Sequence, residues 1–259
     1  VYKRQGKQVP NRQVGDRVCA LLPGGGYGEQ INVPHQMLIS IPETWSFEQA
    51  AAIPEVFLTA YVNLFMEANL QEGETVLIHG GASGVGTAAI QLAREAGCRV
   101  LITAGTDEKT AYCRELGAEL AINYKQEDFA ERIKDHMNGS GVDVILDMVG
   151  AAYLSRNINL LNLKGRLVFI STLSGSQTEI DLRHLMGKRL RLIGSVLRSR
   201  PLAEKIEINQ RFLTQFWDKL VAGKIYPVID SVYPIQQAGL AHEYMSQNKN
   251  IGKIILKID

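Results

Sequence analysis

The chain has 259 residues, 46% of them hydrophobic, and its 28 basic side chains are balanced by 27 acidic ones. This length allows one large α/β domain or two smaller ones, and either can bury a core without disulfides or metals. The net charge of +1 gives no general attraction to nucleic acid or to an anionic membrane, so both are excluded as default partners.

Short strands and then a helix are predicted for the first part of the chain. The stretch up to about residue 42 is rich in Gly, Pro, Val and Ile, and its segments 16–22 and 29–33 have the pattern of short antiparallel strands. From Ser46 the period changes, because the residues that follow resemble a capping box and 57–70 carries apolar residues at helical spacing. We expect a β-rich start and a helical bridge.

A regular alternation of strands and helices is predicted after this bridge. The expected strands are 75–79, 99–103, 119–122, 142–147, 166–171 and 190–196, and the expected helices between them are 85–96, 109–116, 127–137 and 153–161. Strands that are apolar on both faces and alternate with amphipathic helices imply a parallel sheet covered on both sides. The fold class is therefore α/β with a doubly wound sheet. Helices at 201–222 and 234–248 and strands at 228–232 and 251–258 complete the chain.

The most informative motif is a glycine-rich turn after the first of these strands. Gly81 and Gly86 match the first and last positions of GxGxxG, and Ser83 replaces the middle glycine. Such glycines permit a tight bend and let the backbone approach a pyrophosphate, which binds at the N-terminus of the following helix. The alternative is a structural turn without a ligand. The strand, turn and helix context favours dinucleotide binding.

The cofactor's 2′ group is expected to be bound near the end of the next strand. No acid stands immediately at that strand end, and Lys109 is spaced to pair with a 2′-phosphate with help from Gly105 and Thr106. Asp107 leaves an NAD-type acid open, although we favour it as the N-cap of the next helix. We therefore predict NADPH rather than NADH.

Several further motifs occur in the order found in one enzyme family. They are VGDRV at 14–18, LPGGG at 22–26, AAAIPE at 50–55, LTAY at 58–61, NYK at 123–125, LRSR at 197–200 and NKNIGK at 248–253. With the glycine turn, they make the chain resemble the zinc-independent, zeta-crystallin-like quinone oxidoreductases of the medium-chain dehydrogenase/reductase superfamily, closest to the p53-inducible group. The resemblance extends from about residue 14 to the end.

This resemblance implies an organisation into domains. Residues 1–53 would be a partial GroES-like catalytic domain, 54–200 a Rossmann NADP-binding domain with its bridging helix, and 201–259 helices and a strand that return to the catalytic domain. The family's first catalytic-domain strands have no counterpart here. We therefore expect an N-terminally truncated chain, and this expectation leaves open whether the truncated chain is active.

The resemblance also implies a set of site residues. Thr59 would lie beside the nicotinamide, Ser83 and Val85 at the pyrophosphate, and Tyr124 with Lys109 around the 2′-phosphate. The complete predicted cofactor set is Thr59, Gly81, Ser83, Gly84, Val85, Gly86, Gly105, Thr106, Lys109, Tyr124, Ser171, Leu173, Leu197 and Asn250. Thr59, Leu173 and Leu197 are the candidates for the substrate cleft.

No metal ligands and no catalytic acid or base are predicted. Zinc alcohol dehydrogenases of the superfamily use Cys and His ligands and a four-cysteine lobe, whereas the interval from Arg17 to Gly28 holds only Cys19, and Glu55 stands near the position of a ligand Cys. His79 ends a strand before a tight turn, where a packed, hydrogen-bonded histidine is commoner than an acid.

We therefore expect an NADPH-dependent reductase of quinones or related α,β-unsaturated carbonyls, acting as a homodimer. The alternatives are an NADPH-binding structural or regulatory protein without useful turnover, and an enoyl-thioester reductase. Three well-separated cysteines favour a reducing, cytoplasmic location, and no apolar run approaches the length of a membrane span.

Overall fold

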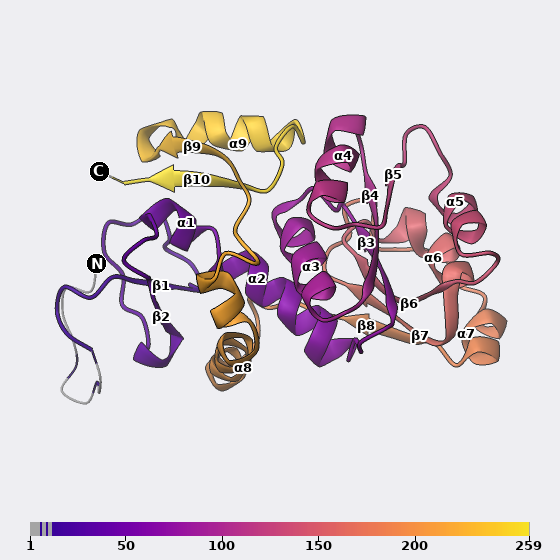
Figure 1. The fold of residues 1–259 in the computed structure, drawn as a ribbon, viewed down its shortest axis with the longest axis horizontal. Helices are drawn as coiled ribbons and strands as arrows, with labels where there is room; N and C mark the ends of the chain where they lie inside the picture. Colours follow the sequence, from indigo (N-terminus) through magenta and orange to yellow (C-terminus); the bar gives the residue numbers. More distant parts are fainter. Residues whose placement is uncertain (1–5, 7–8, 10–11, 259) are drawn as a thin grey trace. The chain divides into compact units, whose positions relative to one another are not determined.

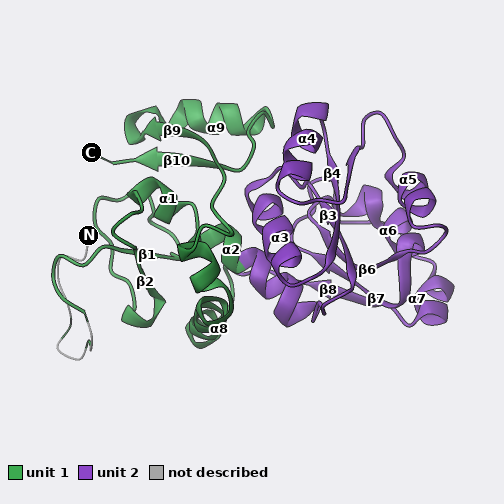
Figure 2. Cartoon of the chain, viewed as in Figure 1, with its two compact units in different colours: residues 1–58, 198–259 green, residues 59–197 purple. Residues whose placement is uncertain are grey.

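The computed structural model describes residues 6, 9 and 12–258. Figure 2 shows the division of the chain into two compact units, one built from the part up to Leu58 together with the part from Arg198 onward, and one spanning Thr59–Leu197. No helix in the described part of the chain has the length and apolar character needed to cross a membrane.

The unit Thr59–Leu197 is built on a six-stranded parallel sheet (Figure 1). Its strands are β3 (Thr75–His79), β4 (Arg99–Ala104), β5 (Leu120–Asn123), β6 (Val142–Asp147), β7 (Leu161–Phe169) and β8 (Arg191–Gly194), in the order β5-β4-β3-β6-β7-β8. Every neighbouring pair is parallel, so all strands end at one edge of the sheet, here termed the carboxyl edge. The predicted doubly wound α/β fold is confirmed.

Helices cover both faces of this sheet. Helices α3 (Gly84–Glu95) and α4 (Asp107–Glu115) lie on one face, and α5 (Phe129–His136), α6 (Leu154–Leu160) and α7 (Leu182–Lys188) lie on the other (Figure 1). The chain moves outward from β3 to β5 and then in the opposite direction from β6 to β8. Since parallel crossovers are right-handed, this reversal sends the two sets of helices to opposite faces.

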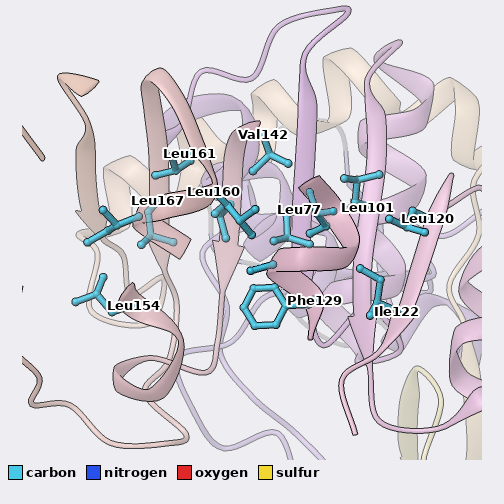
Figure 3. Close-up of a cluster of buried hydrophobic side chains, with 14 of the residues drawn as sticks. Leu77, Leu101, Leu120, Ile122, Phe129, Val142, Leu154, Leu160, Leu161 and Leu167 are labelled. Carbon is cyan, nitrogen blue, oxygen red and sulfur yellow. The ribbon is translucent and has the colours of Figure 1, made fainter. Parts of the chain in front are cut away.

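One hydrophobic cluster fills the face that α5 and α6 cover. Leu77 pairs in register with Leu101 and with Ile145, which places these side chains on the same face of three adjacent strands. Phe129 from α5 and Ile158 from α6 pack against them, and Figure 3 shows Phe129 directed at the strand side chains. Such burial is the main source of the unit's stability.

The described residues of the other unit form two small sheets. Strands β1 (Val18–Ala20) and β2 (Leu38–Ser40) pair antiparallel, and β9 (Ile229–Pro234) and β10 (Lys253–Lys257) pair parallel. Its remaining elements are η1 (His35–Met37), α1 (Phe47–Ala51), α8 (Leu202–Val221), η4 (Ile235–Gln237) and α9 (Ala238–Ser246). Helix α8 buries Phe212 and Phe216, and the Phe212 ring lies 6.1 Å from that of Phe57.

One predicted strand is absent, the predicted helix over 57–70 is helical but changes from α to π, and one helix was not predicted. Residues 29–33 form no strand, because within the described part of the chain they have no ladder partner, and they are mostly exposed. The helix predicted over 57–70 is α2 (Pro54–Tyr61) followed by a π-helix, η2 (Val62–Glu67), in which the amide of Ala68 bonds to the carbonyl five residues earlier. Helix α7 was not predicted, and η3 (Ala151–Tyr153) precedes α6 as a separate 3₁₀ turn.

Candidate functional site

The loops at the centre of the carboxyl edge follow β3 and β6, between which the strand order reverses. In open α/β sheets this reversal point is where ligands bind, because the loops on either side diverge. Here the two loops touch. The sulfur of Met148 packs against Gly80, where an added Cβ would lie 2.6 Å from it.

The glycines of the predicted turn are required by close packing. A Cβ on Gly86 would lie 2.3 Å from the carbonyl oxygen of Gly80, and one on Gly81 would lie 2.7 Å from Cβ of Ile102. The backbone of α3 therefore rests directly on the end of β3, which only glycine allows. This is the close helix and strand packing that the last glycine of the fingerprint provides.

Ser83 caps α3 at the carboxyl edge. Its hydroxyl oxygen accepts a hydrogen bond from the amide of Gly86 at 3.0 Å. Gly84 and Val85 are the first residues of the helix, and amides in the first turn have no carbonyl partner within it. The turn thus presents a helix N-terminus with its positive end at the reversal point of the sheet, which suits an anionic group.

The residues predicted for the 2′ group follow β4 and β5, the strands on one side of this turn. The hydroxyl of Tyr124 lies so close to Gly105 that an added Cβ would be 2.8 Å from it. The Thr106 hydroxyl accepts from the amide of Lys109 at 3.2 Å. The structure therefore brings Gly105 and Tyr124 into contact, and Lys109 lies in the first turn of the helix beside them, although it is only 7% exposed.

The N-cap of α4 is Thr106, so the prediction of Asp107 as the cap is wrong by one residue. The Asp107 carboxylate instead accepts hydrogen bonds from the side-chain amides of Asn123 at 2.7 Å and Gln126 at 3.2 Å. These bonds hold the pKa of Asp107 below its ordinary value. An acid that follows β4 is thus already engaged by the last residue of β5 and by the loop after it.

The residues predicted for the nicotinamide end are spread over several elements. Ser171 and Leu173 follow β7 and are exposed, Leu173 by 76%, whereas Leu197 is buried after β8. Thr59 lies on α2, half buried, and its carbonyl accepts from the Asn63 amide at 2.8 Å. Asn250 belongs to the other unit, where its side-chain amide donates to the carbonyl of Gly252 at 2.9 Å.

A buried polar chain lies below the carboxyl edge, and sequence reasoning missed most of it. His79 bonds through Nδ1 to the Thr103 hydroxyl at 2.9 Å and through Nε2 to Oδ1 of Asn157 at 2.8 Å. The Asn157 amide donates to Asp147 at 3.1 Å. Burial lowers the pKa of His79 to about 4 and raises the pKa of Asp147 above its ordinary value. His79 is therefore a neutral, packed group at pH 7.

Only two features of the sequence pointed toward this row of buried, hydrogen-bonded side chains. His79 and Asp147 both end strands that we predicted with the bounds observed, so both were expected at the carboxyl edge. Asn157 lies within α6 with no distinguishing spacing, and its partners come from β3 and β6, far from it in sequence.

Metal-ligating side chains are not clustered in the part of the chain that the structure describes. No group of three or more His, Cys, Asp or Glu side chains there is arranged to hold a metal ion. Burial raises the pKa of Cys19 and of Cys113 to about 12, so both remain thiols at neutral pH.

Comparison with known proteins gives the class of enzyme that we expected from the sequence. A family profile described as "Zinc-binding dehydrogenase" matches residues 84–213. A quinone oxidoreductase of Sus scrofa is 34% identical and one of Rattus norvegicus 36%, each over 258 residues, which are 99% of this chain and 77% of the relative. The chain belongs to the quinone oxidoreductase family of the medium-chain dehydrogenase/reductase superfamily and is an oxidoreductase.

Solved structures agree with this assignment. The quinone oxidoreductase of Pseudomonas syringae pv. Tomato DC3000 matches with a TM-score of 0.87 and 30% identity, over 98% of this chain and 78% of that one. That of Thermus thermophilus, also solved in complex with NADPH, gives 0.83 and 34%, over 94% and 77%. The CurK enoyl reductase gives 0.82 and 31%, over 98% and 75%.

Proposed function

We propose that the chain binds NADPH along the carboxyl edge of its six-stranded sheet and transfers hydride to a quinone or a related α,β-unsaturated carbonyl, without zinc. The observation that carries this proposal is the turn from Gly80 to Gly86, where glycine backbone packs too closely for any side chain and leads into a capped helix N-terminus. The relative of Thermus thermophilus solved with NADPH supports the choice of cofactor.

The proposed orientation of the cofactor follows from the order of the strands. The pyrophosphate would lie against the first turn of α3, at the amides of Gly84 and Val85. The adenosine would extend toward β4 and β5, and the nicotinamide toward β6 and β7. Gly81, Ser83 and Gly86 would serve by shaping the turn, because Ser83 already caps the helix.

The preference for a 2′-phosphate rests on the environment of Asp107. An acid that binds a ribose 2′-hydroxyl needs a carboxylate oxygen directed at it, and both oxygens of Asp107 accept side-chain amides instead. Gly105, Thr106, Lys109 and Tyr124 would surround the phosphate, with Lys109 supplying the positive charge. NADPH is therefore favoured over NADH.

The proposed chemistry requires alignment more than acid or base catalysis. NADPH supplies the hydride when it is bound. Thr59, Ser171, Leu173 and Leu197 would align the nicotinamide and the acceptor and exclude water from them. A role of Asn250 in cofactor binding stays a prediction. Without a Lewis acid to polarise a carbonyl, the acceptor must carry its own low-lying orbital, as a quinone or conjugated enone does.

A second candidate function is an enoyl-thioester reductase. The similarity to the CurK enoyl reductase over 98% of this chain favours it. The same cofactor site would serve both reactions, so the acceptor distinguishes them. A preference for an enoyl-CoA over a quinone, measured as kcat/KM, would select this candidate. A binding protein without turnover would show NADPH affinity and no acceptor-dependent oxidation.

We also propose that the chain forms a homodimer through β8. In the described sheet this strand pairs with β7 on one side, and it ends the strand order. The exposed apolar side chains Leu182, Met186, Leu192 and Val196 lie on it and on the neighbouring segments. Exposed edge strands with apolar side chains favour pairing with another chain. The cytoplasmic location stays a prediction.

Stopped-flow loss of NADPH absorbance on mixing with a 1,2-quinone tests the reductase proposal.

The choice of cofactor is tested by fluorescence titration of Lys109→Ala with NADPH and NADH. The affinity for NADPH should fall about tenfold or more, and the affinity for NADH should change little. Lys134→Ala, in the last turn of α5, is the matched control. Equal affinities for both cofactors in every variant would remove the 2′-phosphate argument.

A further inference from the structure

The buried polar chain described above joins four elements by side-chain hydrogen bonds. It begins at the Thr103 hydroxyl on β4, passes through His79 on β3 and Asn157 on α6, and ends at the Asp147 carboxylate on β6. All four residues are buried, and His79, Asn157 and Asp147 are fully so. This row of hydrogen-bonded side chains therefore crosses the sheet directly beneath the loops of its carboxyl edge.

The direction of each hydrogen bond follows from the carboxylate. Asp147 only accepts when ionised, so Asn157 donates to it through Nδ2 and accepts through Oδ1. Nε2 of His79 must then donate to Asn157, which leaves Nδ1 to accept from the Thr103 hydroxyl. Every member has a partner and the tautomer of the imidazole is determined.

Asp147, the last member of the hydrogen-bonded chain, holds two loops in place. Asp147 Oδ1 accepts from the amide of Val149 at 2.6 Å and from that of Gly150 at 3.3 Å, which fixes the loop after β6. Carbonyls of that loop in turn accept amides from the segment after β7: Asp147 from Ile170 at 2.9 Å, Met148 from Leu173 at 3.2 Å and Val149 from Ser174 at 2.8 Å.

His79, the second member of the hydrogen-bonded chain, adjoins the glycine turn. His79 immediately precedes Gly80, and the sulfur of Met148 packs on Gly80. The buried chain and the Met148 contact therefore connect the turn proposed for the pyrophosphate to the segment 170–174, which carries Ser171 and Leu173. A shift in the loop after β6 would strain the bonds of the Asp147 carboxylate, whose loss is costly because Asp147 and Asn157 are fully buried.

We propose that Thr103, His79, Asn157 and Asp147 form a positioning network that sets the segment 170–174 relative to the glycine turn, and so sets where the nicotinamide stands for hydride transfer. This inference rests on the proposed function for its catalytic part. Its structural part, that Asn157 determines the order of both loops, stands independently. None of the four residues is proposed to touch the cofactor.

The protein contains a matched control for Asn157. Asn162, on β7, donates to the Asp143 carboxylate at 2.8 Å and accepts from the amide of Gly141 at 2.9 Å. This second asparagine and aspartate pair joins β7 to β6, whereas Asn157 joins α6 to β6, and Asp143 lies at the start of β6 and Asp147 at its end. It is therefore at the opposite edge of the sheet from the proposed cofactor site.

The test compares Asn157→Leu with Asn162→Leu. Leucine keeps the approximate shape of asparagine and removes its hydrogen bonds. We expect single-turnover hydride transfer from saturating NADPH to fall at least tenfold in Asn157→Leu, while the NADPH dissociation constant changes less than threefold. Asn162→Leu should lower the unfolding temperature as well but leave both quantities within twofold. Equal rates in the two variants would overturn the catalytic part.

Amide hydrogen exchange tests the structural part without any turnover. Asn157→Leu should raise exchange at Val149, Gly150, Leu173 and Ser174 at least tenfold and leave Gly141 unchanged, and Asn162→Leu should do the reverse. If the wild type neither binds nor oxidises NADPH, the proposed function fails. If it does both and the exchange pattern is the same in the two variants, the network fails.

Asp147→Asn gives a rescue that a simple packing role does not predict. The new amide can donate to Asn157 if the Asn157 amide rotates and His79 changes tautomer, so the three side-chain bonds from Asp147 to Thr103 survive with their direction reversed. The remaining oxygen still accepts from Val149, and only the 3.4 Å bond from Gly150 to Oδ2 is lost. We expect a rate within threefold of wild type and a shift of the imidazole proton from Nε2 to Nδ1, visible in ¹⁵N NMR. An unchanged tautomer with full activity would contradict the network.

A second variant is available should Asn157→Leu fail to fold. Thr103→Val removes the first member of the network and should show the same pattern of rate and exchange more weakly.

Discussion

The Tyr124 hydroxyl lies against Gly105 so closely that a Cβ at position 105 would be 2.8 Å from its oxygen. These two residues follow adjacent strands, β5 and β4, and both belong to the proposed 2′-phosphate site. Gly105→Ala should displace the tyrosine ring and weaken NADPH binding about tenfold, with a smaller effect on NADH. Fluorescence titration measures both. Gly187→Ala on α7, where an added Cβ meets nothing within 4 Å, should change neither affinity.

Gly86 is the residue at which the turn tolerates a side chain least. An added Cβ would lie 2.3 Å from the Gly80 carbonyl oxygen, and backbone on both sides prevents relief. Gly86→Ala should lower the free energy of unfolding by about 3 kcal/mol in urea titration. Gly239→Ala on α9, in open space, should instead raise it by about 0.5 kcal/mol through the unfolded chain. A stable Gly86→Ala protein with normal NADPH affinity would refute the packing argument.

Ser83 should affect stability and cofactor binding together. Ser83→Ala removes the cap of α3 and should cost about 1 kcal/mol of unfolding free energy. Ser46→Ala removes the same kind of cap from α1 in the other unit and should cost a similar amount. Only the Ser83 variant should lose NADPH affinity in calorimetric titration. Equal losses of affinity would indicate that the cap acts through global stability alone.

His79 should make the protein less stable at mildly acidic pH. Its pKa falls from 6.5 to about 4 on folding because of burial, so the unfolded state takes up its proton first as the pH drops. The contribution is complete above the unfolded pKa and is lost as the pH falls toward the folded one, by about 2 kcal/mol between pH 7 and pH 5.

The His79 effect is isolated by comparison with His79→Gln. Asp147 has a raised pKa and acts with the opposite sign, but it is present in both proteins. The difference between their unfolding free energies should therefore shrink by about 2 kcal/mol from pH 7 to pH 5. A constant difference over this range would show that His79 is not the group responsible.

The proposed dimer predicts a change in mass when the edge strand is altered. Leu192 and Val196 are exposed on and just after β8, so Leu192→Glu combined with Val196→Glu should yield a monomer in light scattering. Tyr226 and Leu240 are also exposed apolar residues but belong to the other unit, and Leu240→Glu serves as the control. A monomeric wild type would end the proposal.

Much of the sheet could be predicted because its strands are apolar on both faces. The bounds of β3 and β6 were predicted as they are observed, since each is a short, mainly apolar run that follows a polar or glycine residue and ends on a polar side chain, His79 or Asp147. The doubly wound order of strands and helices followed from the alternation of these runs. Residues 29–33 misled for a different reason: they alternate polar and apolar residues as a half-exposed strand does, but a strand also requires a partner, which composition does not reveal.

The candidate site divides in the same way. The sequence alone determined the glycine turn, because Ser83 and Gly86 act on neighbours close in the chain, where spacing decides geometry. The contact of Gly81 with Ile102 on β4 came from the tertiary structure. Only the tertiary structure decided that Lys109 is largely buried, that Asp107 is held by Asn123, and that Asn157 links His79 to Asp147. Those contacts join residues brought together by strand order and helix packing, and no local period encodes them.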